Sequence, residues 1–143
     1  GMPEDKIIDT SINLNIPAYI ENDYLPQAEL RLEIYKRLAE CKTQDELVAL
    51  KYEIIDRFGP VSKTFQNLIE LTKLKIISMP LMIKKIIGSS KRIECTFDSA
   101  SPILNDDRSN NLLVFNPEED NSILFLQDTF STIISNLKLD EAG

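Results

Sequence analysis

The sequence predicts an α+β fold: an N-terminal strand, a three-helix segment with an αα-hairpin, then a small mostly antiparallel sheet and a C-terminal helix. Three observations predict it. Polar and apolar residues alternate near the N-terminus, two amphipathic stretches of helical period lie between residues 26 and 60, and short apolar runs separated by loop-forming residues follow residue 80. Helices precede strands without βαβ alternation, which favours an antiparallel sheet.

Residues 5–16 predict the first strand, because every second residue from Ile8 to Ile16 is apolar or Thr. This period of two is typical of a half-buried strand. Residues 17–25 then form a connecting arm, which we expect Tyr19 and Tyr24 to anchor to the hairpin.

The first helix of the hairpin is predicted to begin at Pro26, since proline is tolerated in a first helical turn. Glu33 and Arg37 are four residues apart and can pair along this helix. Its apolar stripe has a period near 3.6 and consists of Leu30, Ile34, Leu38 and Cys41.

The second helix is predicted to begin with a capping box. In it, the Thr43 hydroxyl accepts from the N–H of Glu46, and the Glu46 carboxylate accepts from the N–H of Thr43. The helix should end at Gly59, in a left-handed conformation ahead of Pro60. Its predicted core stripe is Leu47, Leu50, Ile54 and Phe58, widened by Val48, Tyr52 and Ile55.

A third helix is predicted from an N-cap at Ser62 to Pro80. Residues 81–87, 92–97, 112–115 and 123–126 then predict strands, the last two joined as a hairpin through residues 116–121. Residues 98–110 have loop composition, and Asp128 is predicted to cap the final helix.

With 143 residues, 43% of them hydrophobic, the chain is expected to form a single domain over residues 1–143. No apolar run approaches 18 residues and no secretory signal is visible, which predicts a cytoplasmic protein without a membrane span. Gly1 precedes Met2, as after removal of an expression tag, so we expect a piece of a longer protein.

Composition argues against an enzyme. The chain has no His and only four Gly, so it lacks the commonest general base and has no Gly-rich phosphate loop. The acidic groups at 106–107 and 118–120 lack the regular spacing of a metal-binding loop. Cys41 and Cys95 are expected to be buried thiols. We expect no catalytic residues, no cofactor and no metal.

The net charge of −7 argues against a nucleic-acid-binding domain as a whole, although six basic and no acidic residues lie between 73 and 92. Three interpretations of this segment stay open: a solvated face, a DNA contact or a contact with an acidic protein surface. The possible basic patch is Lys84, Lys85, Lys91 and Arg92.

A different surface is predicted on the second helix. If its stripe points inward, Glu53 and Asp56 project outward together, and Arg57, four residues from Glu53, can hold the Glu53 carboxylate. This face is either simply solvated or an acidic patch that docks on a basic partner surface.

The hairpin also resembles a known family. The sequences Ala-Tyr-Ile at 18–20, Asp-Tyr-Leu-Pro at 23–26, Arg-Leu at 31–32, Tyr-Lys-Arg-Leu-Ala at 35–39 and Glu-Ile-Ile-Asp-Arg-Phe-Gly-Pro at 53–60 are similar to the C-terminal domain of bacterial transcription-repair coupling factors. The resemblance covers about residues 7–80. Glu21 stands where the family often has Pro, and Met82 stands where it often has Gly, which leaves the exit from the third helix open.

The resemblance implies a non-catalytic regulatory domain of a large ATP-driven DNA translocase, whose ATPase site lies outside this chain. Such a domain docks on an N-terminal module that resembles a nuclease subunit. Docking masks the surface for the damage-recognition subunit of excision repair and restrains the motor, and RNA polymerase engagement releases it. Under this reading Glu53, Asp56 and Arg57 form the interdomain contact, with no membrane and no direct nucleic-acid partner. The alternatives are a nucleic-acid-binding module that uses residues 73–92, or a purely structural cap.

Overall fold

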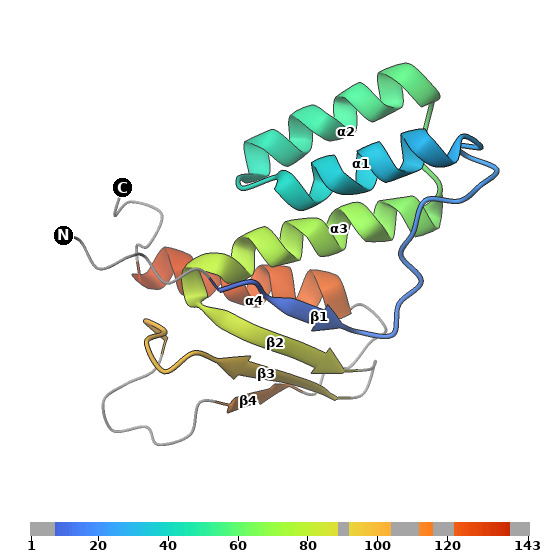
Figure 1. The fold of residues 1–143 in the computed structure, drawn as a ribbon. Helices are drawn as coiled ribbons and strands as arrows, with labels where there is room; N and C mark the ends of the chain where they lie inside the picture. Colours follow the sequence, from blue (N-terminus) through green and yellow to red (C-terminus); the bar gives the residue numbers. More distant parts are fainter. Residues whose placement is uncertain (1–7, 89–91, 104–111, 116–121, 138–143) are drawn as a thin grey trace. The chain divides into compact units, whose positions relative to one another are not determined.

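The structure is a computed structural model that describes residues 8–88, 92–103, 112–115 and 122–137 (Figure 1). The chain divides into two compact units. One, the helical unit, is Ile16–Ile76, and the other, the sheet unit, combines Gly1–Asn15 with Ile77–Gly143. Each unit has its own set of buried apolar side chains.

The helical unit contains α1 (Ala28–Glu40), α2 (Gln44–Phe58) and all but the last two residues of α3 (Lys63–Ser78), which confirms the predicted αα-hairpin followed by a third helix. Helix α1 begins two residues after Pro26 and has no side-chain cap. The chain just before the helix is held by Arg31, whose Nη1 donates to the carbonyls of Leu25 and Pro26, at 2.7 and 2.9 Å. The buried core of the unit is formed by Ile20, Leu25, Ile34, Leu38, Leu47, Leu50, Ile54, Phe65, Ile69 and Ile76.

The start of α2 is capped much as predicted. The N–H of Glu46 donates to Oγ1 of Thr43 at 3.1 Å. The Glu46 carboxylate accepts from the N–H of Lys42 at 2.7 Å, one residue before the predicted partner. Both bonds satisfy amide groups at the start of the hairpin's second helix, so the turn between the helices is fixed locally.

The arm before α1 is held by two tyrosines, of which only one was predicted. The Tyr24 hydroxyl donates to the carbonyl of Gly59 at 2.6 Å. The second anchor is Tyr35, whose hydroxyl accepts from the N–H of Ile20 at 2.8 Å. The side chain of Tyr19 is 48% exposed, so its predicted anchoring role is wrong, and only its backbone N–H bonds to the carbonyl of Thr64.

Glu21, where the family resemblance suggests Pro, belongs to the arm before α1 and contacts the first turn of α3. Its carboxylate accepts from the Thr64 hydroxyl at 2.7 Å. Hydrogen bonds from Thr64 and then Ser62 lower the pKa of Glu21. The predicted cap is confirmed, because Oγ of Ser62 accepts from the N–H of Phe65 at 3.2 Å. The arm is therefore tied to α3 by an interaction that proline could not make.

Gly59 ends α2 with a φ of 93° and a ψ of −178°, a region open essentially to glycine alone. The predicted positive φ is confirmed, although the ψ differs from that of a left-handed helix cap. An added Cβ would meet no atom within 4 Å, so any penalty for a side chain is conformational rather than steric. The Gly59 N–H donates to the carbonyl of Ile55 at 2.8 Å.

We therefore expect Gly59→Ala to lower the free energy of unfolding by about 1–3 kcal/mol, because alanine would occupy a glycine-only conformation. Urea unfolding followed by tyrosine fluorescence measures this directly, since all four tyrosines lie in the helical unit. Ala49→Gly, at an exposed position inside α2, is the matched control and should cost roughly 0.5–1 kcal/mol. Unchanged stability of Gly59→Ala would show that this residue has an ordinary conformation.

The sheet unit contains a four-stranded sheet in the order β1-β2-β3-β4. Strand β1 (Ser11–Asn13) runs parallel to β2 (Ile83–Gly88), while β3 (Ile93–Phe97) is antiparallel to both β2 and β4 (Leu112–Phe115). Helix α4 (Ser122–Leu137) covers one face of this sheet (Figure 1). The predicted α+β class and mostly antiparallel sheet are confirmed.

Strand β1 is shorter than the predicted strand over residues 5–16. Only three residues pair with β2, and Asn15 then adopts a positive φ of 57°, which ends the extended run. Thr10 still follows the predicted alternation, because it is buried and its hydroxyl donates to the carbonyl of Ile83 at 2.7 Å. The part of the prediction before residue 8 lies outside the described residues.

The predicted strand at 123–126 is wrong, because these residues form the first turns of α4. Leu124 is 45% exposed whereas Leu126 is fully buried. Residues two apart share a face in a strand but lie on nearly opposite sides of a helix, so only a helix explains this difference. Asp128 consequently lies inside α4 rather than at its cap. The predicted connection at 116–121 lies outside the described residues.

The exit from α3 keeps an unusual geometry at Met82. After the short 3₁₀ helix η1 (Met79–Leu81), Met82 has a left-handed backbone with φ 53° and ψ 46°. Glycine adopts this conformation without strain, which agrees with the glycine suggested there by the family resemblance. The Met82 carbonyl accepts from the N–H of Asp98 at 2.9 Å, and this bond helps to hold the turn in place.

Candidate docking site on the helical hairpin

Helix α2 carries the residues predicted to contact another module. Its buried residues, Leu47, Leu50 and Ile54, face the core of the helical unit. Asp56 and Arg57 are exposed and Glu53 is half-exposed, so the predicted outward projection of this face is confirmed. That this face contacts a partner remains a prediction.

Glu53 is the centre of an ion-pair cluster that joins the two helices of the hairpin. Arg37 of α1 donates two hydrogen bonds to the two carboxylate oxygens of Glu53, at 2.5 and 2.8 Å. Arg57 donates from Nη1 to Oε2 at 3.3 Å, as expected for a pair four residues apart. Arg37 thus pairs with Glu53 across the hairpin, in a two-bond geometry that fixes both side chains.

This cluster changes the ionisation of Glu53. Hydrogen bonds from Arg37 are the main cause that lowers the pKa of Glu53 from 4.5 to about 2, with a smaller contribution from Arg57. The same hydrogen bond raises the pKa of Arg37. The folded state therefore favours the ionised carboxylate, and two guanidinium groups offset its single negative charge. The carboxylate of Asp56 makes no ion pair or hydrogen bond within the described part of the chain.

We expect this stabilisation to depend on pH. The pKa of Glu53 is lower in the folded state than in the unfolded state, so the carboxylate stabilises the fold above pH 4.5, and this contribution is lost as the pH falls toward 2. The difference in urea midpoint between the natural chain and Glu53→Gln should be largest near pH 6 and shrink below pH 4.5. Asp56→Asn removes a carboxylate from the same helix face outside the cluster, so it is the control and should change the urea midpoint little. A Glu53→Gln difference independent of pH would contradict the cluster.

A hollow of about 390 Å³ lies beside the same ion pair. Its lining combines charged and apolar groups from both helices of the hairpin, and it includes Cys41. Burial raises the pKa of the Cys41 thiol, and its sulfur donates to the Arg37 carbonyl at 3.4 Å. A thiol with a raised pKa is a weaker nucleophile, so Cys41 does not have the lowered pKa that is typical of a catalytic cysteine.

Two residues of α2 were wrongly assigned to the core. Tyr52 is 69% exposed and Val48 is 49% exposed, so they do not widen the buried stripe. Phe58, also predicted as core, is only partly buried, and the guanidinium of Arg57 lies over its ring at 4.7 Å from the centroid. The sequence pattern alone could not show how much of the helix its neighbours cover. The outer face of α2 therefore presents an aromatic side chain between acidic residues.

The basic segment is the second candidate. Lys84 and Lys85 are both exposed on β2, because a register shift between Ile83 and Lys85 interrupts the alternation of faces. Arg92 is exposed, but its Nε pairs with the Glu94 carboxylate at 3.1 Å. Lys91 lies outside the described residues.

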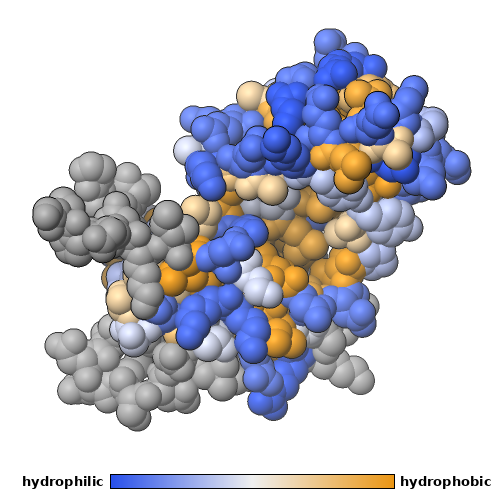
Figure 2. Space-filling view, viewed as in Figure 1, coloured by the Kyte–Doolittle hydropathy of each residue, from blue (hydrophilic) through white to orange (hydrophobic). Residues whose placement is uncertain are grey.

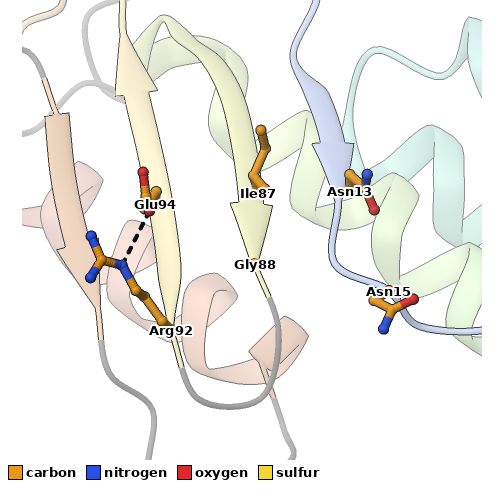
Figure 3. A pocket seen from close by; sticks show the side chains of 6 residues that line it. All are labelled: Asn13, Asn15, Ile87, Gly88, Arg92 and Glu94. Atoms are coloured by element: carbon orange, nitrogen blue, oxygen red, sulfur yellow. Dashed lines mark hydrogen bonds and ion pairs between the residues drawn. The ribbon is translucent and has the colours of Figure 1, made fainter.

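A hollow of about 440 Å³ lies on the face of the sheet opposite α4, between β1 and β3 (Figure 3). Figure 3 shows the Arg92–Glu94 pair at one side of it and the side chains of Asn13 and Asn15 at the other. The space-filling view shows hydrophilic and hydrophobic residues mixed over the sheet unit, while hydrophilic residues dominate the visible side of the helical unit (Figure 2). The sheet face is therefore not a continuous basic surface.

Within the described residues, no group of three or more Cys, Asp or Glu side chains is arranged to hold a metal ion. In the same part of the chain, no helix is both long and apolar enough to cross a membrane. Burial raises the pKa of the Cys95 thiol to about 12, so this side chain is also unreactive.

Comparison with known proteins places this geometry in a family. The family model of the TRCF domain matches residues 14–107. A transcription-repair-coupling factor from Escherichia coli (strain K12) is 35% identical over 82 residues, which are 57% of this chain and 7% of the relative. The Haemophilus influenzae protein of the same name is 40% identical over 75 residues, 52% of this chain and 6% of the relative. The Staphylococcus aureus (strain USA300) protein of the same name is 28% identical over 92 residues, which are 64% of this chain and 8% of the relative.

The chain thus spans less than a tenth of the length of these curated relatives. A crystal structure of the C-terminal domain of a transcription-repair coupling factor has a TM-score of 0.78 with this fold, over 95% of this chain and 96% of that one, at 18% sequence identity. The shared fold agrees with the sequence match. The chain belongs to the TRCF domain family and has the fold of the C-terminal domain of a transcription-repair coupling factor.

Proposed function

We propose that this chain is a non-catalytic regulatory domain of a multidomain transcription-repair coupling factor, an ATP-driven DNA translocase with its motor elsewhere. The domain docks through α2 on the N-terminal, nuclease-subunit-like module of the same polypeptide. In that state it masks the surface for the damage-recognition subunit of excision repair and restrains the motor. Engagement of RNA polymerase releases it.

The observation that carries this proposal is the exposed carboxylate of Asp56, which has no ion-pair partner among the described residues and lies next to the Arg37–Glu53–Arg57 cluster, in a chain that belongs to the TRCF domain family. A helix fixed in this way presents its charge without further ordering on binding. Charge complementarity sets the orientation of such a contact, and truncating one partner of a desolvated pair costs about 2–5 kcal/mol.

Because Glu53 belongs to this cluster, a variant of Asp56 tests the contact better than a variant of Glu53 does. Glu53→Lys would place a third cation between Arg37 and Arg57 and disturb the hairpin itself. Asp56→Lys reverses a charge that has no partner within the described residues, so it changes the surface and leaves the core of the unit intact. Glu29→Lys, on exposed α1, makes the same change of charge elsewhere in the unit and is the matched control.

In the full-length protein we expect Asp56→Lys to increase the affinity for the damage-recognition subunit, because weaker docking exposes the masked surface. Calorimetric titration at two salt concentrations measures this, and Glu29→Lys should behave like the natural protein. Deletion of residues 1–143 from the parent should raise the affinity at least as much. If neither Asp56→Lys nor the deletion changes the affinity, the regulatory function is wrong and a structural cap remains.

A nucleic-acid-binding function is the weaker candidate. Three basic residues of this segment are described on the sheet. Of these, Arg92 pairs with a carboxylate, whereas Lys84 and Lys85 have no carboxylate partner among the described residues. The whole chain carries a net charge of −7. A gel-shift experiment with duplex and single-stranded DNA at low salt tests it. A shift at tens of micromolar that disappears in Lys84→Glu/Lys85→Glu would establish this function instead, since phosphate contacts dominate such binding.

A further inference from the structure

Strand β1 is weakly attached to the sheet unit. It lies at the edge of the sheet and pairs with β2 alone, through Ser11–Asn13 (Figure 1). None of its three residues is buried, whereas buried and half-buried side chains alternate along the whole of β3. Without β1, the strands β2, β3 and β4 would still form a continuous antiparallel sheet. The sheet therefore depends little on the three residues of β1.

The segment is held more firmly at its two ends. Thr10, just before β1, is 2% exposed, and its hydroxyl donates to the carbonyl of Ile83 at 2.7 Å. A buried carbonyl that loses its partner is left unsatisfied, because water does not replace the bond. At the other end, Leu14 is buried and Asn15 has a positive φ of 57°. One polar bond and one apolar contact therefore fix a strand that contributes little burial of its own.

A strained residue lies beside the Thr10 bond. Met82 has a left-handed backbone with a φ of 53°, which is unfavourable for residues other than glycine. The carbonyls of Leu81 and Met82 accept from the Ser101 hydroxyl at 2.6 Å and from the Asp98 N–H at 2.9 Å. The carbonyl of the next residue accepts from Thr10. Such a conformation persists only where the surrounding structure holds it, and here three successive carbonyls are held.

We propose that residues 10–13, here called the β1 latch, leave and rejoin the sheet as one piece while β2, β3 and β4 stay folded. The Thr10 hydroxyl is the catch, and the buried Leu14 is the fixed end. Opening of the Thr10 bond removes one of the interactions that hold Met82, so the strain at Met82 favours opening.

General properties of local opening support this assignment. Segments held by few buried apolar side chains open at a lower free energy than the core does. Hinges are a few loop or element-terminal residues that absorb a change in φ and ψ. Among the described residues, Asn15 and Met82 are the two other than glycine with a positive φ, and they flank the β1–β2 pair at its two ends.

The latch also has a consequence that rests on the proposed function. There the motor precedes this domain in the parent polypeptide, so β1 is the first described strand of the domain that movement of the motor reaches along the chain. The latch itself is a property of this chain and is tested on it alone.

Amide hydrogen exchange of the 143-residue chain, followed by mass spectrometry, tests the latch. We expect the hydrogen-bonded amides of residues 11–13 to exchange at least about a hundredfold faster than those of residues 93–97. Thr10→Val keeps the shape but removes the hydroxyl, so it should accelerate exchange in the latch about tenfold and leave residues 93–97 within about twofold. Thr10→Ser keeps the hydroxyl and should exchange at nearly the natural rate.

A variant of Met82 tests the strain. Glycine adopts the left-handed conformation freely, so Met82→Gly should slow exchange in the latch about threefold, part of the gain being lost to the greater freedom of glycine in the open state. Met82→Ala removes the same side chain but keeps the strain, so it is the matched control and should not slow exchange.

Each result bears on one part of the proposal. Equal exchange rates in residues 11–13 and 93–97 would mean that the sheet unit opens only as a whole, which overturns the latch. An unchanged rate in Thr10→Val would overturn the catch, and equal rates in Met82→Gly and Met82→Ala would overturn the role of strain. None of these results touches the regulatory function, which is tested in the full-length protein.

Discussion

Phe65→Ala is expected to lower the free energy of unfolding of the helical unit by about 3–5 kcal/mol. The Phe65 ring is fully buried on α3. It meets the ring of Tyr24 edge to face, with centroids 5.3 Å apart and an interplanar angle of 89°. The substitution removes apolar contacts, leaves a cavity and breaks an aromatic pair, which adds about 0.5–1.5 kcal/mol to simple burial.

Tyrosine fluorescence during urea unfolding is the appropriate measurement, because the chain has no Trp and its four tyrosines all lie in the helical unit. Tyr24 also reports the local change beside the cavity. Phe58→Ala is the matched control: it removes the same side chain from a partly buried position on α2, so its effect should be clearly smaller. A cost of Phe65→Ala below about 1 kcal/mol would show that α3 packs through a different face.

The helical hairpin could be predicted from the sequence because its signals are local. A capping residue, a stripe of period 3.6 and a terminal glycine each act within a few residues, and at α2 they coincide. The Arg57–Glu53 contact was predictable for the same reason. The stronger Arg37–Glu53 contact joins residues 16 apart on two helices, and its geometry depends on how the helices pack.

The exposure of Tyr52 and the length of α4 depend on tertiary structure and could not be read from the pattern. An apolar residue at the edge of a helical stripe is buried only if a neighbouring element reaches it, and none of the described elements covers Tyr52. A four-residue apolar run such as 123–126 fits a strand or a buried helical turn equally well. Burial of Leu126 together with Phe130 selects the helix.

The register of α4 leads to the second large effect. Phe130→Ala is expected to lower the free energy of unfolding of the sheet unit by about 3–5 kcal/mol, because its ring is fully buried. Phe125→Ala is a matched control in the same helix. Its ring is 36% exposed, so we expect a loss of about 1 kcal/mol.

Cys95 provides the probe for the sheet unit, which has neither Trp nor Tyr. Its thiol is fully buried on β3, and burial raises its pKa to about 12, so it reacts with a thiol reagent only when the unit opens. In a Cys41→Ser background, Phe130→Ala should accelerate the labelling of Cys95 by at least about a hundredfold, since 1.4 kcal/mol corresponds to roughly tenfold. Phe125→Ala should accelerate it by less than about tenfold. Equal acceleration by the two variants would mean that α4 does not present Phe130 to the core, and the helical register over residues 122–137 would then be wrong.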